Sequence, residues 1–187
     1  MIKNWEDLQH YLESDRRALD IKRKRPMLFG DESWKFQRAL RYKEYYHNIQ
    51  RGPLDAVWYT YYRYVTHRLA VMLGYTISIN CCGPGLQLPH RGTIIINDQV
   101  RIGTNCRIHA GVNIGAHKGR APVIGNNVYI APGVKIFGDI TIADGVKIGA
   151  NAVVNKSFLT PDAIIVGNPA RELVQRESSE SNTQSDN

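Results

Sequence analysis

The chain has 187 residues, of which 43% are hydrophobic and 22% charged, so it can form one sizeable core and has the composition of a soluble globular protein. Its longest apolar run, residues 69–79, is too short to span a membrane, and no signal-peptide pattern opens the chain, so we expect a cytoplasmic location. The net charge of +7 is compatible with binding of an anionic small molecule. The basic cluster at 22–26 lacks a motif that recognises nucleic acid, so no nucleic-acid partner is expected.

Residues 1–72 form the first predicted region, which is helical. One helix is predicted to begin near Asn4, a second after Asp31, and a third between Pro53 in its first turn and Gly74 as its C-terminal cap. The apolar residues assigned to them are Trp5, Leu8, Leu12 and Leu19, then Trp34, Leu40 and Tyr45, then the stripe of Trp58, Tyr62, Val65, Leu69 and Met72. We expect this stripe to pack against the rest of the chain or another subunit, in preference to a membrane interface.

Residues 73–174 form the second region, in which aliphatic residues return at every sixth position. The series runs Ile96, Ile102, Ile108 and Ile114, then Ile124, Ile130, Ile136, Ile142, Ile148 and Val154. Two places earlier stand Cys106, Val128, Val134, Ile140, Val146 and Ala152, which the pleat places on the same inner face. Gly, Asn and Asp fall between them at predicted corners. A period of six fits neither a helix nor a plain strand, and predicts a three-sided coil of short strands.

The phase of six slips once, between Ile114 and Ile124, where ten residues replace six. A polar, glycine-containing insertion of four residues is best placed as a loop outside the stack. The same phase extended back from Ile96 would put His90 at an inner position unless the phase slips there as well.

Cys81, Cys82 and Cys106 lack the spacing of metal ligands and are interpreted as reduced structural thiols, and no metal is expected. Residues 175–187 are polar and predicted to be disordered.

Three segments carry a resemblance to a known family. They are CGPGLQLPHRGTIIIN at 82–97, NCRIHAGVNIGAHKGRAPVIGNNVYIAPGVKIFGDI at 105–140 and VGNPAR at 166–171. Together they resemble bacterial serine O-acetyltransferases of the hexapeptide-repeat acyltransferase group. The resemblance implies a left-handed parallel β-helix, assembled into homotrimers or a dimer of trimers, with active sites between neighbouring coils. It implies acetyl-CoA as cosubstrate and O-acetylation of L-serine, as in cysteine biosynthesis.

The chemistry needs a base for the acceptor hydroxyl and donors for the oxyanion. The resemblance implies that His90 is the catalytic base and that Arg120, in the inserted loop, binds the acceptor's carboxylate. It further implies that acetyl-CoA lies in the groove between coils, contacting the residues Gly115, Ala131, Lys135, Gly149 and Lys156. His109 follows an inward residue and should face outward, either in a groove or on plain surface.

The chain departs from the better-known serine enzymes at the acceptor side. Pro89 stands where they have an Asp, Ala121 where they have a His, and Tyr75 near the expected dyad carboxylate, so the residue that orients His90 is not identified. A sugar hydroxyl in capsule or exopolysaccharide synthesis is therefore an alternative acceptor, and a non-catalytic scaffold a third hypothesis. The chain also ends in Asn187 and not in isoleucine, which makes a complex with cysteine synthase doubtful.

Overall fold

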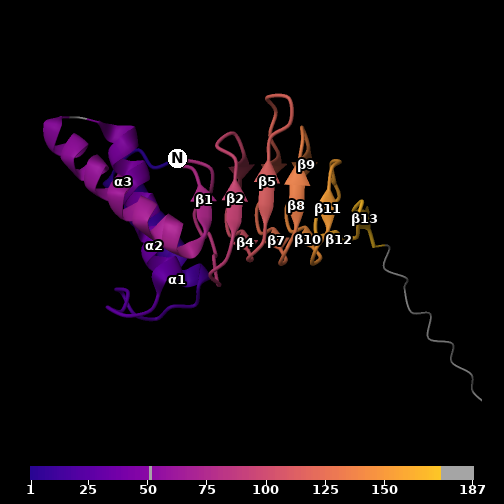
Figure 1. Cartoon of the computed structure of the whole chain (residues 1–187), viewed down its shortest axis with the longest axis horizontal. Coiled ribbons are helices and arrows are strands. Elements are labelled where there is room, and N and C mark those ends of the chain that lie inside the picture. Colours follow the sequence, from indigo (N-terminus) through magenta and orange to yellow (C-terminus); the bar gives the residue numbers. More distant parts are fainter. Residues whose placement is uncertain (51, 174–187) are drawn as a thin grey trace, which may run out of the picture.

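The computed structural model describes residues 1–50 and 52–173, in which three helices precede a coil of short strands (Figure 1). The helices are α1 (Trp5–Ala18), α2 (Glu32–Ile49) and α3 (Pro53–Leu73). The strands are β1 (Tyr75–Ile77), β2 (Ile94–Ile96), β3 (Arg101–Ile102), β4 (Arg107–Ile108), β5 (Asn113–Gly115), β6 (Val123–Ile124), β7 (Tyr129–Ile130), β8 (Lys135–Phe137), β9 (Thr141–Ile142), β10 (Lys147–Ile148), β11 (Val153–Val154), β12 (Ile164–Val166) and β13 (Arg171–Glu172). None of the helices in this part of the chain is long and apolar enough to cross a membrane.

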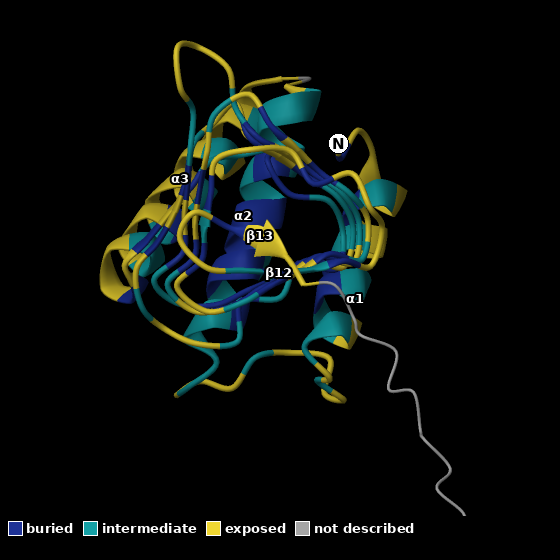
Figure 2. Ribbon diagram, turned by 90° about the vertical axis from the view of Figure 1, so that its right-hand side faces the viewer, coloured by how far each residue is buried: buried dark blue, intermediate teal, exposed yellow. Residues whose placement is uncertain are grey.

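The strands form three sheets that the chain visits in turn. Sheet A has the order β1-β2-β5-β8-β11, sheet B the order β3-β6-β9, and sheet C the order β4-β7-β10-β12, with β13 added antiparallel to β12. Neighbouring strands within each coil sheet pair in parallel, and the view along the coil shows its closed outline (Figure 2). We name the three corners after the sheets they join: the A–B, B–C and C–A edges. The predicted three-sided parallel β-helix with a helical N-terminal region is confirmed.

The core is the stack of inward residues that the period of six predicted. All members of both inner series, from Ile96 to Val154 and including Cys106, are at most 7% exposed. Burying one such aliphatic side chain contributes about 1.5–3 kcal/mol, so the stack is the main source of the coil's stability. The three cysteines are free and buried, and burial raises the pKa of the Cys81 and Cys106 thiols to about 11. They are therefore unreactive thiols, as expected.

Strand register shows where the repeat slips. Ile114 pairs with Ile136, twenty-two positions later, so the four extra residues leave the stack as an exposed loop, as predicted. Ile77 pairs with Ile96, nineteen positions later and not eighteen. Within this turn Gln87 pairs with Arg107, twenty positions later, so two extra residues enter the coil between Gln87 and Ile95, and one fewer precedes Cys82. The two extra residues lie in the corner that contains His90, whose side chain is exposed, so the inner position obtained by extending the phase is wrong for His90.

The glycines and Asx residues of the repeat are explained by the corners. At the B–C edge, the stacked residues Gly85, Asn105, Asn127, Gly145 and Asp162 all have positive φ, between 54° and 80°. Gly and Asn adopt this left-handed conformation most readily. A Cβ on Gly85 would also lie 2.1 Å from the side-chain oxygen of Asn105 in the next turn. The stacked corners therefore select residues that adopt positive φ, and the close approach of Asn105 adds a need for glycine at position 85.

The three helices begin where the sequence predicts, and α2 and α3 pack together. Asn4 caps α1 by accepting a hydrogen bond of 2.8 Å from the Asp7 N–H. Gly74 caps α3 in the left-handed conformation. The middle of the predicted stripe on α3 is half-buried, whereas Trp58 and Met72 at its two ends are 47% and 57% exposed, so packing of these ends against another subunit stays a prediction.

Candidate active site

His90 lies on the C–A edge, where the coil meets the helical region. Leu88 is fully buried two residues before it and Ile94 four residues after it, while His90 itself is exposed. In front of it lies a pocket of about 480 Å³ between the coil and the segment that joins α1 to α2. The pocket is lined by Ala18, Leu19, Asp20, Ile21, Asp31, Glu32, Ser33, Trp34, Gln87, Leu88, Pro89, His90, Arg91 and Arg107. A small molecule in it would be in reach of the imidazole.

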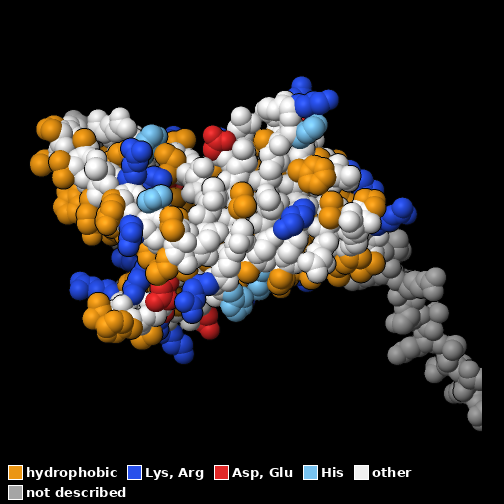
Figure 3. All heavy atoms as spheres, viewed as in Figure 1, with side chains coloured by type: hydrophobic (Ala, Val, Ile, Leu, Met, Phe, Trp, Pro, Cys, Tyr) orange, Lys and Arg blue, Asp and Glu red, His pale blue; other side chains and the backbone are white. Residues whose placement is uncertain are grey.

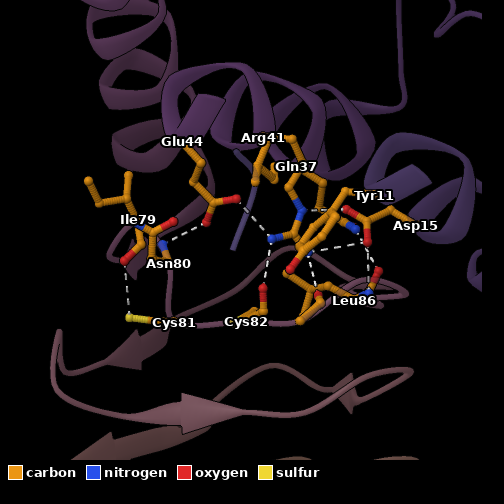
Figure 4. Close-up of polar contacts among 12 residues, drawn as sticks. Tyr11, Asp15, Gln37, Arg41, Glu44, Ile79, Asn80, Cys81, Cys82 and Leu86 are labelled. Atoms are coloured by element: carbon orange, nitrogen blue, oxygen red, sulfur yellow. Dashed lines mark hydrogen bonds and ion pairs between the residues drawn. The ribbon is translucent and has the colours of Figure 1, made fainter. Parts of the chain in front are cut away.

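The segment that leads to His90 is tied to the helices by side chains of α1 and α2 (Figure 4). The Asp15 carboxylate accepts hydrogen bonds of 2.9 Å from the N–H groups of Gly85 and Leu86. The Gln37 amide donates to the Leu86 carbonyl at 2.6 Å. Arg41 donates to the carbonyl of Cys82 at 2.8 Å. Backbone groups of this segment that the coil leaves unpaired are thus satisfied by buried side chains, which fixes the path of the chain toward His90.

Arg41 is the centre of this network, and it is fully buried together with two carboxylates. Its guanidinium lies 2.9 Å from an Asp15 oxygen and 3.0 Å from a Glu44 oxygen. Burial alone would lower the pKa of Arg41, but Asp15 and Glu44 outweigh it and raise that pKa. Burial raises the pKa of Glu44 in spite of the nearby guanidinium. Such a buried triad is costly to break because removing one partner leaves a charge uncompensated.

Tyr75, near which the resemblance implies a dyad carboxylate, contacts the main chain of His90. Its hydroxyl donates to the His90 carbonyl at 2.7 Å and lies 3.0 Å from the Ser33 hydroxyl. Its ring is buried against Phe36, with ring centroids 5.1 Å apart. Among the described residues, no side chain hydrogen-bonds the His90 imidazole. His90 is therefore held through its backbone.

His109 lies beside His90 and is buried, only 8% exposed. Its ring lies between those of His90 and Tyr129, with centroids 5.7 and 5.1 Å away. Its Nε2 accepts a hydrogen bond of 3.2 Å from the Arg107 guanidinium, which requires an unprotonated nitrogen. Burial, Arg107 and His90 lower the pKa of His109. A neutral imidazole thus lies beside His90.

Arg120 lies far from this pocket in the same chain, in the loop at the A–B edge. His117 and Arg120 exchange two backbone hydrogen bonds, and Lys118 and Gly119 between them have positive φ, as in a tight hairpin turn. The Arg120 guanidinium is exposed and pairs with Asp139 at 2.6 Å. Figure 3 shows histidine side chains both on this loop and at the opposite edge of sheet A.

The residues implied for acetyl-CoA binding fall on both edges of sheet A. Ala131 and Gly149 follow β7 and β10 and stack with His109 along the C–A edge. Lys135 on sheet A reaches toward the same edge, where its Nζ donates to the Gly111 carbonyl at 2.5 Å. Gly115 and Lys156 lie with Arg120 at the A–B edge, and the Lys156 ammonium lies 5.4 Å from the Phe158 ring centroid. One chain does not bring the two groups together.

Sequence reasoning missed the helical half of the site. Asp15, Gln37, Arg41 and Glu44 are four polar residues buried in helices. Spacing offered a weak signal for two of them, since Arg41 and Glu44 are three apart on one helix face. Nothing in the sequence indicated that this face would meet the segment before His90.

The repeat and the fold have known counterparts. Residues 121–156 match the family model described as bacterial transferase hexapeptide (six repeats). The coil over these residues is thus of the hexapeptide-repeat type found in bacterial transferases. The chain is 32% identical over 150 residues to a serine acetyltransferase of Buchnera aphidicola, a match that covers 77% of the chain and 54% of the relative. It is 38% identical over 97 residues to a serine acetyltransferase of Helicobacter pylori, covering 50% of the chain and 56% of the relative.

Solved hexapeptide-repeat transferases have the same fold. The soybean serine acetyltransferase apoenzyme superposes with a TM-score of 0.70 at 26% identity, covering 90% of this chain and 69% of that one. The Neisseria gonorrhoeae serine acetyltransferase in complex with serine gives a TM-score of 0.69 at 26% identity, covering 91% and 70%. This chain spans about half the length of the curated relatives it matches.

Proposed function

We propose that this hexapeptide-repeat protein is a serine O-acetyltransferase, which transfers acetyl from acetyl-CoA to the hydroxyl of L-serine. The observation that carries the proposal is the exposed His90 on the wall of a pocket of about 480 Å³. This pocket belongs to a coil whose relatives are named serine acetyltransferases, one of them solved in complex with serine. A cytoplasmic location is part of the same proposal.

In the proposed reaction, His90 removes the proton of the serine hydroxyl as its oxygen attacks the thioester carbonyl. The new C–O bond gives a tetrahedral intermediate with an oxyanion. Collapse of this intermediate breaks the C–S bond, and the leaving thiolate takes the proton from the imidazolium. A base held in place and two substrates bound together suffice for this chemistry, so no acyl-enzyme is needed.

The charges of the pocket support an amino-acid acceptor. Arg91 and Arg107 line it from the coil, while Asp20, Asp31 and Glu32 line it from the helical side. A zwitterion such as serine needs both signs of charge close together. Asp31 is already paired with Arg23 and Glu32 accepts from the Gly30 N–H, which leaves Asp20 as the carboxylate with fewest partners among the described residues.

The distribution of the candidate residues supports a threefold assembly. His90, Ala131 and Gly149 flank sheet A on one edge, whereas Gly115, Arg120 and Lys156 flank it on the other. In a ring of three copies with sheet A turned inward, the C–A edge of one copy lies beside the A–B edge of the next. The outward residues of sheet A fit such contact: Thr76, Ile95, Asn113 and Val153 are uncharged, and Lys135 is the one cation among them. We propose the homotrimer, with acetyl-CoA in the groove between copies.

A sugar hydroxyl is the second candidate acceptor, and one observation favours it. Arg120, which would hold the carboxylate of serine, pairs with Asp139 instead. In addition, Pro89 and Ala121 replace polar residues of the serine enzymes. A sugar carries no carboxylate or ammonium and would not need those contacts.

Release of CoA thiol from acetyl-CoA tests the proposal, with L-serine, L-homoserine and a panel of sugars as acceptors. Turnover with serine supports the primary function, and turnover with a sugar alone supports the second candidate. Thiol release with none of them would contradict both and favour a scaffold.

A further inference from the structure

The segment between α1 and α2 carries two features that the proposed function does not use. Residues 22–25 are four consecutive cations, Lys-Arg-Lys-Arg, and all are exposed. Residues 27–29 are Met-Leu-Phe, with exposed fractions of 50%, 83% and 85%. We call residues 22–30 the basic–apolar loop. Single exposed hydrophobic residues are common, but three in a row beside four cations are not.

Hydrogen bonds and an ion pair hold the basic–apolar loop in a conformation that exposes these side chains. The Asp31 carboxylate pairs with Arg23 and accepts a hydrogen bond of 3.0 Å from the Met27 N–H. The Lys35 ammonium donates to the Leu28 carbonyl at 2.7 Å. The loop backbone is thus anchored to the start of α2, which leaves the Leu28 and Phe29 side chains at its tip.

The loop projects from the helical half of the molecule beside the pocket of His90. Figure 1 shows it beyond the ends of α1 and α2, and Figure 3 shows hydrophobic side chains there flanked by Lys and Arg. Its base is shared with the pocket, since Asp20, Ile21 and Asp31 line that cavity. Whatever binds the loop is therefore held near the pocket mouth.

We propose that the basic–apolar loop docks on an anionic lipid surface. Clusters of four or more Lys and Arg are attracted to anionic headgroups, and apolar side chains at the tip can enter the boundary between headgroups and acyl chains. Either signal alone gives weak and reversible binding, whereas the two together reinforce each other. No carboxylate lies within residues 22–30, and the nearest, Asp31, is neutralised by Arg23, so the tip carries net positive charge.

Co-sedimentation of the full chain with vesicles tests this inference. We expect binding to vesicles of 30% phosphatidylglycerol in phosphatidylcholine and at least tenfold weaker binding to phosphatidylcholine alone. Raising the salt from 0.1 to 0.5 M should weaken binding to the anionic vesicles, because the cations are exposed. The assay does not depend on acetyl transfer, so it is independent of the proposed function.

Two variants separate the contributions of the loop. Leu28→Ser with Phe29→Ser should weaken anionic-vesicle binding at least tenfold, and Lys22→Gln with Arg25→Gln should weaken it and reduce its salt dependence. Arg23 is left unchanged because it pairs with Asp31. Leu159→Ser removes an exposed apolar side chain of the coil, 69% exposed, and should bind like the wild type.

Three results would overturn the proposal. The first is wild-type binding that does not distinguish anionic from neutral vesicles. The second is an unchanged affinity of the Leu28→Ser, Phe29→Ser variant, which would mean purely electrostatic adsorption, as on any polyanion. The third is the absence of wild-type binding to any vesicle, together with a change of oligomeric state, measured by light scattering, in the Leu28→Ser, Phe29→Ser variant. That result would make the loop a contact between copies of this chain.

Discussion

The hydroxyl of Tyr75 donates a 2.7 Å hydrogen bond to the main-chain carbonyl of His90, fifteen residues later in the sequence. Tyr75 opens the first strand of the coil, and His90 closes the first turn at the C–A edge. This contact fixes the backbone of the proposed base at a point where no described side chain holds its imidazole. The orientation of His90 is thus set by backbone contacts within the first turn of the coil.

Tyr75→Phe should lower kcat about tenfold, because loss of a positioning contact misplaces the base by a fraction of an ångström. The KM for acetyl-CoA should be unchanged. The stoichiometry of CoA binding, measured by calorimetry, should also be unchanged, since it reports the fraction of intact binding sites. Tyr64→Phe, on the exposed face of α3, is the matched control. A kcat within twofold of wild type would show that the contact does not position His90.

His90→Ala should reduce turnover by about two or more orders of magnitude, since general-base catalysis by a histidine contributes about that much. Binding of CoA should persist, because the imidazole is assigned to the acceptor side. His67→Ala, an exposed histidine of α3, should retain full activity. A rate for His90→Ala equal to that of wild type would remove His90 from the mechanism.

His109 should make stability depend on pH. Its pKa is lowered in the folded chain by burial, Arg107 and His90, whereas in the unfolded chain it returns to about 6.5. The unfolded state therefore binds more protons between the lowered pKa and pH 6.5. The free energy of unfolding should be highest above pH 7 and should fall as the pH falls through that window. Urea titrations at pH 8 and pH 5.5 measure it.

In His109→Gln, the difference between those two free energies should shrink, because the titrating group is gone. In this variant His90, Arg107 and Tyr129 still face position 109. Their contributions to the pH dependence of stability therefore cancel when the variant is compared with the wild type. An equal pH dependence in both proteins would show that His109 is not held neutral by its surroundings.

Gly115 and Gly149 should respond differently to the same substitution. A Cβ at Gly115 meets no atom within 4 Å, whereas one at Gly149 would lie 2.7 Å from Val166 Cγ1. Gly149→Val should therefore destabilise the coil by about 1–3 kcal/mol through overpacking. Gly115→Val should keep the Tm of wild type and raise the KM for acetyl-CoA about tenfold, if the groove between copies passes there. Thermal unfolding and initial rates measure the two effects, and an unaltered KM would place the ligand elsewhere.

Asp15→Asn should destabilise the chain by about 3–5 kcal/mol, because it leaves the fully buried Arg41 with one carboxylate where it had two. Glu13→Gln on the same helix is the control: Glu13 pairs with Arg16 and Arg17, but its side chain is 42% exposed, so its loss should cost at most about 1 kcal/mol. Urea unfolding compares them. Equal costs for the two variants would mean that the buried triad contributes no more than a surface pair.

The sequence alone determined the coil, because its signal is local and repeated. Each turn places an aliphatic residue inward at the same phase and a Gly or Asx residue at the same corner, so many independent positions support one geometry. The inserted loop was visible for the same reason, as a break of four residues in that phase. Helix starts at Asn4 and Pro53 followed from capping preferences, which also act within a few residues.

Only the tertiary structure decided how the site is built. The Asp15 contact with Gly85 joins residues seventy positions apart, and no periodicity specifies which helix face meets which turn of the coil. The exposure of His90 depends on two extra residues in its corner, which show only in strand pairing, and the burial of His109 depends on the ring of Tyr129 from the next turn. Long-range packing sets these contacts, because each is the result of many weak interactions between distant segments and not of the spacing of neighbours along the chain.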